Sequence, residues 1–357
     1  CGVIISSSGA RITGVRGDPD HPANQGRLCS KGATLHLSAD PVVAAQTRLL
    51  QPQRRLVRGG DLLPMSWDAA MQWAAQQLTQ TVRLHGANAL GFYVSGQLLT
   101  EDYYVFNKLA KGLLGTNNID TNSRLCMSSA VAGYKLTLGA DAPPACYDDV
   151  MQADCLFIAG SNAAYAHPVL FRRIEEARAR NPHLKIIVAD PRRTDTAEIA
   201  DLFLQIQPGT DVALMLAMMH VLIRDGLVDR EWVDAHTVGF DALAAHVAEW
   251  TPARAATITG LAEDDIETLA RRYGTESPAA IRTLVGAEHH EHGGMFFRTL
   301  TCLPALIGAW RHAAGGVLLS SGDSFPKRPD RLEQRTFATS ADGATPAVEL
   351  DGVTATH

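Results

Sequence analysis

Three short polar loops of the sequence carry the residue types that a bound dinucleotide needs. They are Gly160-Ser161-Asn162, Asp190-Pro191-Arg192-Arg193-Thr194 and Gln207-Pro208-Gly209-Thr210-Asp211. Backbone N–H groups at a helix start bind phosphate, arginine neutralises it, and carboxylates accept hydrogen bonds from ribose or a purine. Glycine, asparagine, aspartate and proline are also the ordinary residues of turns, so one such loop alone favours a structural role.

A single cysteine, Cys126, stands where a helix is expected to begin. The helix dipole and the neighbouring Arg124 should lower the pKa of its thiol, and a soft thiolate suits a metal ion. The commoner role of a lone cysteine is that of a small buried hydrophobic residue. That second role is expected for Cys146, Cys155 and Cys302.

The histidine-rich segment His289-His290-Glu291-His292 has residue types that zinc prefers. Contiguous histidines lack the i, i+4 spacing of a helical zinc motif. The spacing therefore disfavours zinc for this segment.

Each polar loop follows a short apolar run and precedes a helix-like stretch. The runs are 155–159, 185–189 and 202–206, and a fourth, 280–285, leads into the histidine-rich segment. Repetition of strand, polar loop and helix predicts an α/β fold with a parallel sheet, whose ligands bind at the carboxyl ends of the strands. Three polar loops in register at those ends favour one nucleotide site. The usual glycine-rich fingerprints of NAD and nucleoside triphosphate sites do not occur.

Composition limits the classes of partner. The 357 residues, 46% hydrophobic and 20% charged, suit a globular protein of two or three domains. A net charge of −6 argues against nucleic acid as the main partner, and no apolar run is long enough to span a membrane. Six cysteines without short-spaced pairs make a poor disulfide framework and favour a reducing compartment, so a cytoplasmic location is expected.

The first and last parts of the chain give weaker local signals. Residues 3–16 predict a small hairpin, Ser66 is a plausible N-cap of a helix from Trp67 to His85 that Gly86 ends, 89–94 predicts a strand, and 101–114 a helix. The first residue is Cys1 and the residues from Pro326 onward are polar without periodicity. We therefore expect a fragment whose true start is missing and whose end is a linker or an interrupted domain.

Taken together, these segments resemble the bis-molybdopterin guanine dinucleotide oxidoreductases and, over about the first 210 residues, the assimilatory nitrate reductases. Cys1-Gly2-Val3 resembles the end of the family's C-x2-C-x3-C motif, and Cys29-Ser30-Lys31-Gly32 its fourth cysteine with the lysine that follows. Residues 95–104 resemble the pterin segment, and 116–126 the approach to the molybdenum ligand. The loops at 160–162 and 190–194 match the guanine-dinucleotide loops.

The resemblance implies two cofactors, molybdenum-bis(molybdopterin guanine dinucleotide) and a 4Fe–4S cluster. Cys1 and Cys29 would ligate the cluster, and Lys31 would lie between cluster and pterin as a catalytic residue on the electron path. Gln97 and Asn122 would contact the pterin, and Cys126 would bind molybdenum. The remaining cofactor-binding residues would be Gly160, Ser161, Asn162, Asp190, Arg192, Thr194, Gly209, Asp211 and His289.

The expected domains follow the same resemblance. They are a partial 4Fe–4S domain at 1–45, a first pterin-binding α/β region at 46–125, a Rossmann-like nucleotide-binding domain at 126–325, and a linker or truncated domain start at 326–357. The first two cluster cysteines and a domain closing over the second pterin are absent, as truncation would explain. After about residue 212 the likeness shifts, and 285–290 stands where nitrate reductases usually carry G-x-N-Q.

The implied reaction is reduction of a small oxyanion, nitrate, to nitrite by oxygen-atom transfer. Its electrons would come one at a time through the cluster from ferredoxin, flavodoxin or an NAD(P)H-dependent partner subunit. The nearest rival is formate dehydrogenase, but those enzymes usually carry histidine after the metal-binding residue, where this chain has Met127. Another molybdopterin oxidoreductase of unknown substrate, a non-catalytic electron-transfer subunit of the same fold and a simple nucleotide-binding module also stay open.

Overall fold

The computed structural model describes residues 1–9, 11–319, 338–339 and 346–347. They fall into two compact units. Unit 1 holds residues 1–4, 15–33 and the described part of 126–325, and unit 2 holds the described parts of 5–14, 34–125 and 326–357. The predicted four-domain division stays a prediction.

Unit 1 is built on a parallel sheet of five strands. They are β7 (Cys155–Ala159), β8 (Lys185–Ala189), β9 (Leu202–Leu204), β10 (Ala279–Thr283) and β11 (Gly316–Leu318). Their order is β11-β10-β7-β8-β9 and every neighbouring pair is parallel. The predicted α/β class with a parallel sheet is therefore confirmed.

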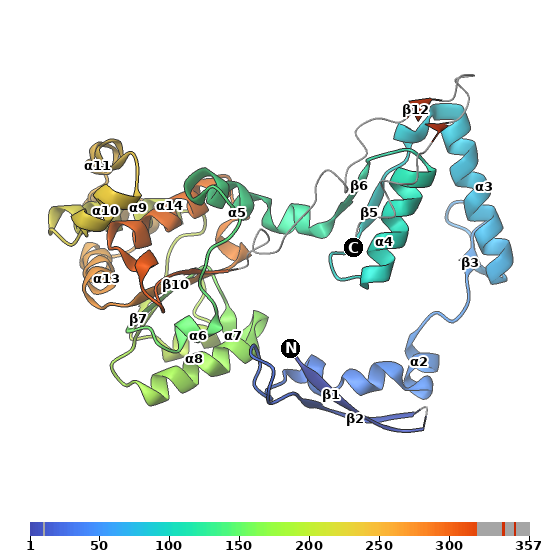
Figure 1. Cartoon of the computed structure of the whole chain (residues 1–357), viewed down its shortest axis with the longest axis horizontal. Helices are drawn as coiled ribbons and strands as arrows, with labels where there is room; N and C mark the ends of the chain where they lie inside the picture. The colour runs from blue at the N-terminus through green and yellow to red at the C-terminus, as the bar shows by residue number, and fades with distance from the viewer. Residues whose placement is uncertain (10, 320–337, 340–345, 348–357) are drawn as a thin grey trace. The chain divides into compact units, whose positions relative to one another are not determined.

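The sheet separates two hydrophobic cores. Along β7, Cys155, Phe157 and Ala159 belong to one core, whereas Leu156 and Ile158 belong to the other. All five residues are buried, because helices cover both faces of a parallel sheet. The first core takes in residues of α9 (Asp211–Arg224), α12 (Pro252–Thr259), α13 (Glu263–Thr275) and α14 (Gly293–Leu306), and the second takes in residues of α8 (Pro168–Arg180) and the end of α6 (Tyr147–Val150). In Figure 1, α9 and α14 lie on one side of the sheet, and α6 and α8 lie on the other.

The helices of unit 1 connect and cover these strands. Their bounds are α1 Ser30–Ala33, α5 Asn122–Leu138, α6 Tyr147–Val150, α7 Ala163–Ala166, α8 Pro168–Arg180, α9 Asp211–Arg224, α10 Arg230–His236, α11 Phe240–Val247, α12 Pro252–Thr259, α13 Glu263–Thr275 and α14 Gly293–Leu306. The first residues of α5, up to Leu125, belong to unit 2. Helix α9 has ten buried residues and contacts α11, α12, α13 and α14. It therefore organises one side of the sheet.

Helices α5 and α14 approach each other at backbone distance. A Cβ atom on Gly133 would lie 2.5 Å from Phe297 Cβ and 2.8 Å from the Gly294 carbonyl oxygen. Tyr134 packs edge-on against Phe297, and the Thr137 and Thr301 hydroxyl oxygens are 2.8 Å apart. The carboxyl-terminal half of α5 is thus held tightly on α14.

Unit 2 contains α2 (Pro41–Thr47), α3 (Trp67–His85), α4 (Thr100–Asn107) and three short strand pairs. The strands are β3 (Gln53–Arg54) with β4 (Leu63–Pro64), β5 (Phe92–Val94) with β6 (Ile119–Thr121), and β12 (Ala338–Thr339) with β13 (Pro346–Ala347). The Ser66 side chain accepts from Ala69 N at 3.2 Å and Gly86 follows the last turn of α3, as predicted. Strands β1 (Val3–Ser8) and β2 (Arg11–Gly17) form the predicted two-stranded element.

Several predicted bounds are wrong. The strand expected at 89–94 begins at Phe92 because 87–89 form a 3₁₀ turn, and the helix expected at 101–114 changes after Asn107 to one π-helical segment, Lys108–Leu113. The strands expected at 202–206 and 280–285 end at Leu204 and Thr283, because the apolar residues that follow leave the sheet. The expected linker at 326–357 lies outside the described residues except for β12 and β13.

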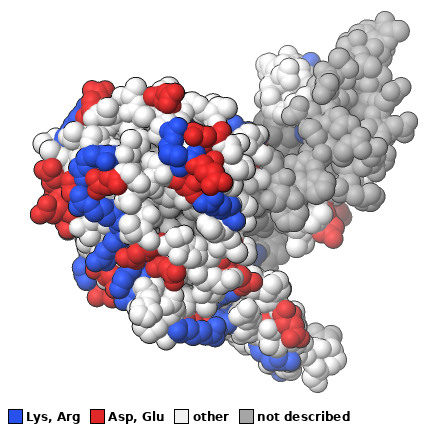
Figure 2. All heavy atoms as spheres, turned by 60° about the vertical axis from the view of Figure 1, so that its left-hand side comes forward, with Lys and Arg blue, Asp and Glu red and all other residues white. Residues whose placement is uncertain are grey.

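Two features bear on the expectation of neither nucleic acid nor a membrane as partner: the distribution of surface charge and the character of the helices. On the face shown in Figure 2, positive and negative side chains are interspersed. Arg224 and Arg271, for example, both pair with Asp225 and Glu267. Within the described residues, no helix has the length and apolar character needed to cross a membrane.

The α5–α14 contact yields a stability prediction. Gly133→Ala should destabilise the protein by about 1–3 kcal/mol, because the added Cβ overpacks a backbone contact. Gly294→Ala is the matched control, since its Cβ would lie 3.9 Å from the nearest neighbouring atom, Ser129 O, and alanine favours a helix. Denaturant unfolding of both variants measures the difference. Equal stability of the two would contradict the prediction.

Candidate functional site

The predicted nucleotide loops all leave the same edge of the sheet in unit 1. Gly160 follows β7, Asp190 follows β8, and the segment with Gly209 and Asp211 follows β9. Gly160 N donates to Ala189 O at 3.0 Å and Asp190 N to Leu204 O at 3.2 Å, so each loop is tied to the neighbouring strand. The sheet therefore brings these residues together, as expected.

The first loop is pressed against the segment that follows β10. Gly160 has a φ of +59°, and a Cβ on it would lie 2.8 Å from Ala287 Cβ. A Cβ on Gly286 would lie 2.8 Å from Gly160 O. Because β7 and β10 are parallel neighbours, the segments that follow them leave the same end of the sheet side by side. Glycine at 160 and 286 permits this approach.

Two hydroxyl groups of these loops are buried without a partner. Ser161 Oγ and Thr194 Oγ1 lie away from solvent and make no hydrogen bond within the described residues. Such orphaned groups are uncommon and call for an explanation, of which a bound ligand is one. Asn162, by contrast, has its Oδ1 engaged by Tyr165 N at 3.4 Å and Thr196 Oγ1 at 3.1 Å. Its oxygen therefore caps α7.

The second and third loops bring carboxylates together. Asp190 Oδ1 accepts from Arg192 N at 2.8 Å, which shapes the loop. Burial raises the pKa of Asp211 to about 6; the charge of Asp190 adds to this effect, while that of His290 opposes it. Gly209 lies beside the same ring, since a Cβ on it would be 3.3 Å from His290 Nδ1. Hydrogen-bond donors of a purine or ribose would favour the ionised form of this buried carboxyl group and so lower its pKa again.

Arginine side chains in the second loop divide in role. Arg193 pairs with Glu198 at 3.1 Å and lies over the Phe203 ring, so its charge is already compensated. Arg192 is exposed. Of the two arginines, Arg192 is the better candidate for phosphate.

Cys126 is the fifth residue of α5 rather than its first, which corrects the expectation of a helix start. Its side chain is half-buried, and its carbonyl oxygen lies 3.1 Å from His289 Nε2. Arg124, expected to act on the thiol, forms an ion pair with Asp120 at 2.9 Å. That pairing lowers the pKa of Asp120.

Gln97 and Asn122 belong to unit 2, where they follow two parallel neighbours. The segment Ser95-Gly96-Gln97 follows β5 and Asn122 follows β6. Asn122 Oδ1 accepts from Gly96 N at 2.5 Å, and a Cβ on Gly96 would lie 2.5 Å from Ser123 Oγ. The structure thus joins the two predicted pterin segments, and their pterin contacts stay predictions.

The two predicted cluster cysteines lie on segments joined by one buried asparagine. Asn24 Oδ1 accepts from Gly2 N at 2.6 Å, and Asn24 Nδ2 donates to Gly2 O at 3.0 Å and Arg27 O at 2.9 Å. Asn24 is fully buried. It therefore ties the residue after Cys1 to the loop that leads to Cys29.

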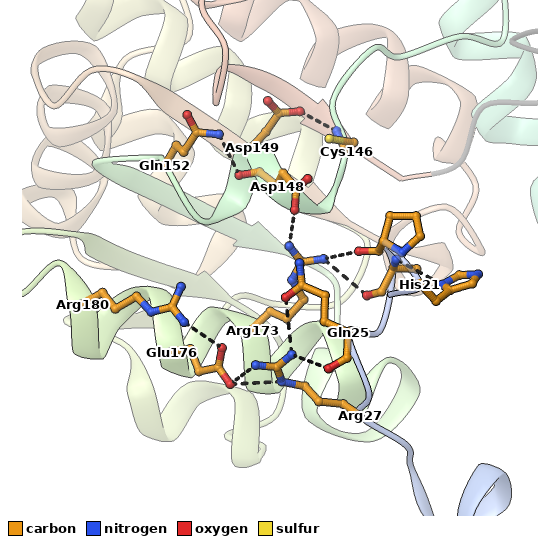
Figure 3. A network of polar contacts seen from close by, with 12 residues as sticks. His21, Gln25, Arg27, Cys146, Asp148, Asp149, Gln152, Arg173, Glu176 and Arg180 are labelled. Carbon is orange, nitrogen blue, oxygen red and sulfur yellow. Dashed lines mark hydrogen bonds and ion pairs between the residues drawn. The ribbon is translucent and has the colours of Figure 1, made fainter. Parts of the chain in front are cut away.

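Arginines also fix this loop to α8 (Figure 3). Arg173, a buried residue of α8, donates to Pro22 O at 3.1 Å and Ala23 O at 3.3 Å and pairs with Asp148. Arg27 of the loop reaches the other way, to Glu176 of α8, with Nε 3.0 Å from Oε1. The loop before Cys29 is thereby fixed to α8, which comes after the short helix α7 in the chain.

The residues around Cys29 favour its thiolate. The hydrogen bond from Gly32 N, helped by the N–H and charge of Lys31, lowers the pKa of Cys29. Burial, and then the charges of Arg282 and Lys31, lower the pKa of His167 at the start of α8. Lys31 therefore lies close enough to both groups to act on them electrostatically.

The remaining cysteines differ in burial. Burial raises the pKa of Cys155 to about 12 and raises that of Cys302, as expected for apolar positions. The expectation was wrong for Cys146, which is exposed just before α6. Among the described residues, no group of three histidine, cysteine or acidic side chains is arranged to hold a metal ion.

Three buried polar residues of this region were not predicted from the sequence. Asn24, Arg173 and Glu288 each have a hydrogen-bond partner at least 22 residues away in the chain. Only Glu288 lies in a segment that the sequence singled out, 285–290, where it directly precedes the histidines. Its place in that segment is the one signal by which the sequence pointed to any of the three.

Comparison with known proteins gives a family. The protein-family model described as molybdopterin oxidoreductase matches residues 48–336. A second family model, described as molybdopterin oxidoreductase Fe4S4 domain, matches residues 1–40. Acetylene hydratase from Pelobacter acetylenicus is a similar solved structure, with a TM-score of 0.71 and 26% identity. The match covers 86% of this chain and 42% of that one.

Curated relatives include several nitrate reductases. The chain is 40% identical to the nitrate reductase of Synechocystis sp., covering 82% of this chain and 40% of the relative. It is 41% identical to the periplasmic nitrate reductase of Desulfovibrio desulfuricans, covering 93% of this chain and 47% of that relative. An F420-dependent formate dehydrogenase 1 subunit alpha of Methanococcus maripaludis is 36% identical, covering 80% and 41%. The chain thus spans less than half the length of these relatives.

The burial of Asp211 yields a pH prediction. With no nucleotide bound, folding raises its pKa from 3.8 to about 6, so its stabilising contribution is complete below pH 3.8 and is lost as the pH rises through 6. The loss by pH 8 is at most about 3 kcal/mol. Asp211→Asn should remove this loss and stabilise the nucleotide-free protein at pH 8, as urea unfolding at pH 5 and pH 8 would measure.

Asp225→Asn is the opposite-signed control. Arg224 and Arg271 lower the pKa of Asp225 to about 2, so its contribution is present above pH 3.8 and is lost as the pH falls through 2. This substitution should destabilise the protein at pH 8. If Asp211→Asn also destabilised the nucleotide-free protein at pH 8, the raised pKa of Asp211 would be wrong.

Proposed function

Because this chain belongs to the molybdopterin oxidoreductases, we propose that it forms the nucleotide-binding and metal-binding part of an enzyme that reduces nitrate to nitrite. The family's cofactors are a molybdenum–pterin and a 4Fe–4S cluster. The reaction balances as nitrate plus two electrons and two protons giving nitrite and water. The pterin-held metal supplies the two-electron chemistry.

The chain's own residues would bind and orient the cofactor. Ser161 and Thr194 would offer their buried hydroxyl groups, Asp190 and Asp211 would accept from the guanosine end, and Arg192 would neutralise phosphate. Gly160 and Gly209, both at positive φ, let the backbone approach the nucleotide. Gln97 and Asn122 would meet the pterin, and His289 would lie beside the metal-binding turn of α5.

Cys126 would supply a thiolate to molybdenum. Met127, the residue after Cys126, distinguishes between the two candidate substrates. It packs against the hydrophobic core and offers no proton acceptor. This absence of a titratable group at the position after the thiolate is the observation that supports nitrate over formate. The identity with nitrate reductases of Synechocystis and Desulfovibrio supports the same choice.

Formate oxidation is the second candidate. It is favoured by His289, whose ring lies against the Cys126 carbonyl and could serve as a base near the metal. The formate dehydrogenase relative is less similar than the two nitrate reductases. Nitrate is therefore the proposed substrate.

Electrons would enter through the cluster. Cys1 and Cys29 would be two of its ligands, with Asn24 and Arg173 fixing the segments that carry them. The proposed donor is ferredoxin, flavodoxin or an NAD(P)H-dependent partner subunit, and the proposed location is the cytoplasm. Cell fractionation and reduction of the enzyme by each purified donor would test these two proposals.

The substrate proposal is tested in the holoenzyme. We expect nitrite from nitrate with reduced viologen as donor, and no dye reduction with formate. Cys126→Ala should lose this activity together with bound molybdenum, because the thiolate ligand is gone. Cys146→Ala is the control, since that cysteine is exposed and lies beyond the end of α5. Formate oxidation by the wild type, or full molybdenum content in Cys126→Ala, would refute the respective assignment.

Lys31 yields a separate prediction. Lys31→Met removes the charge that helps to lower the pKa of Cys29, while keeping a long flexible side chain. We expect iron and molybdenum contents to be retained and nitrate turnover to fall about tenfold or more, which corresponds to about 1.4 kcal/mol on a barrier. Lys31→Arg should recover most of the rate. Loss of iron from Lys31→Met would indicate a structural role instead.

A further inference from the structure

The segment between β10 and α14 reaches two parts of the proposed site at once. Ala287 packs on Gly160 of the first nucleotide loop, and the His290 ring lies beside Gly209 of the third. The two residues between them, Glu288 and His289, turn to helix α5 instead. All of these residues belong to unit 1.

Glu288 and His289 contact the turn of α5 that begins at Cys126. Glu288 Oε2 accepts from Ala130 N at 2.8 Å, and His289 Nε2 lies 3.1 Å from Cys126 O. In an α-helix, the N–H of residue 130 and the carbonyl of residue 126 are the two ends of one i→i−4 hydrogen bond. The adjacent side chains therefore contact the donor and the acceptor of the same helical turn.

The position of Glu288 is a poor one for stability alone. The residue is 2% exposed, and its Oε1 atom is buried without a hydrogen-bond partner within the described residues. An unsatisfied buried oxygen of a carboxyl group costs free energy that an apolar side chain would not. Helix α5 is already fixed to α14 through Gly133, Tyr134 and Thr137. The contact to Ala130 adds a constraint only near Cys126.

We propose that Glu288 is a positioning residue that sets the orientation of the Cys126 thiolate toward the metal. It acts through the Ala130 amide, with His289 holding the Cys126 carbonyl. The inference rests on the proposed role of Cys126 as the molybdenum ligand. It assigns to the 285–290 segment the task of aligning the metal-binding turn with the nucleotide loops, which that same segment contacts.

The test compares three variants of the holoenzyme. Glu288→Ala removes the acceptor, Glu288→Gln keeps one, and Thr301→Val removes a buried hydroxyl contact to the far end of α5. Three readouts are taken: hydrogen exchange of the Ala130 amide, the Mo(V) electron paramagnetic resonance signal, and kcat and KM for nitrate.

Glu288→Ala should speed exchange at Ala130, alter the Mo(V) signal and lower kcat by about 10- to 100-fold with little change in KM, as loss of a ligand's supporting contact does. Glu288→Gln should stay near the wild type in all three readouts, because its amide oxygen can accept from Ala130 N. Thr301→Val should leave the Mo(V) signal unchanged, although it loosens the other end of the helix.

The inference is overturned if Glu288→Ala leaves exchange or the Mo(V) signal as in the wild type, or if Thr301→Val alters that signal equally. If Glu288→Gln also alters the Mo(V) signal, the charge of Glu288 and not its hydrogen bond to Ala130 is responsible, and the inference is overturned. If Glu288→Ala does not fold, the exposed His289→Ala variant must still alter the Mo(V) signal. Molybdenum retained by Cys126→Ala would refute the proposed ligand itself, whereas the exchange readout judges the Ala130 contact independently of the metal.

Discussion

The contact between Gly160 and Ala287 governs the arrangement of the proposed site. Strands β7 and β10 are parallel neighbours, so the chains leaving them cross the same sheet edge together. A side chain at 160 would lie 2.8 Å from Ala287 Cβ, and one at 286 would meet Gly160 O. With glycine at both places, the segment after β10 closes on the first nucleotide loop. From there Glu288 and His289 reach α5.

The buried guanidinium group of Arg173 holds a second segment of the proposed site, the loop before Cys29, in place. Arg173 combines an ion pair to Asp148 with hydrogen bonds to two carbonyl oxygens of the loop before Cys29. A guanidinium suits this position because its five N–H groups can satisfy several acceptors from one buried charge. Helix α8 thereby anchors the loop that leads to the proposed cluster ligand Cys29.

Features that depend on local signals could be predicted from the sequence. Strands β7 and β8 and the ends of α3 followed from apolar runs, the Ser66 cap and Gly86. Strands β9 and β10 were predicted too long, because Ile206 stays buried after leaving the sheet and apolar type alone does not mark the last ladder hydrogen bond. Asn24 and Glu288 could not be predicted, because no periodicity reports contacts between residues 22 or 158 positions apart.

Arg173 recognises its loop through main-chain oxygens, and Arg172 does the same at Leu28 O, 3.0 Å from its Nη1. Every amino acid presents a carbonyl group, so this mode of attachment does not depend on which side chains stand at positions 22, 23 and 28. Random mutation of those three positions should therefore be tolerated far better than mutation of the arginines. Positions 22, 23 and 28 are therefore free to change while the attachment of the loop to α8 stays the same, because the residues that recognise it stand on the helix.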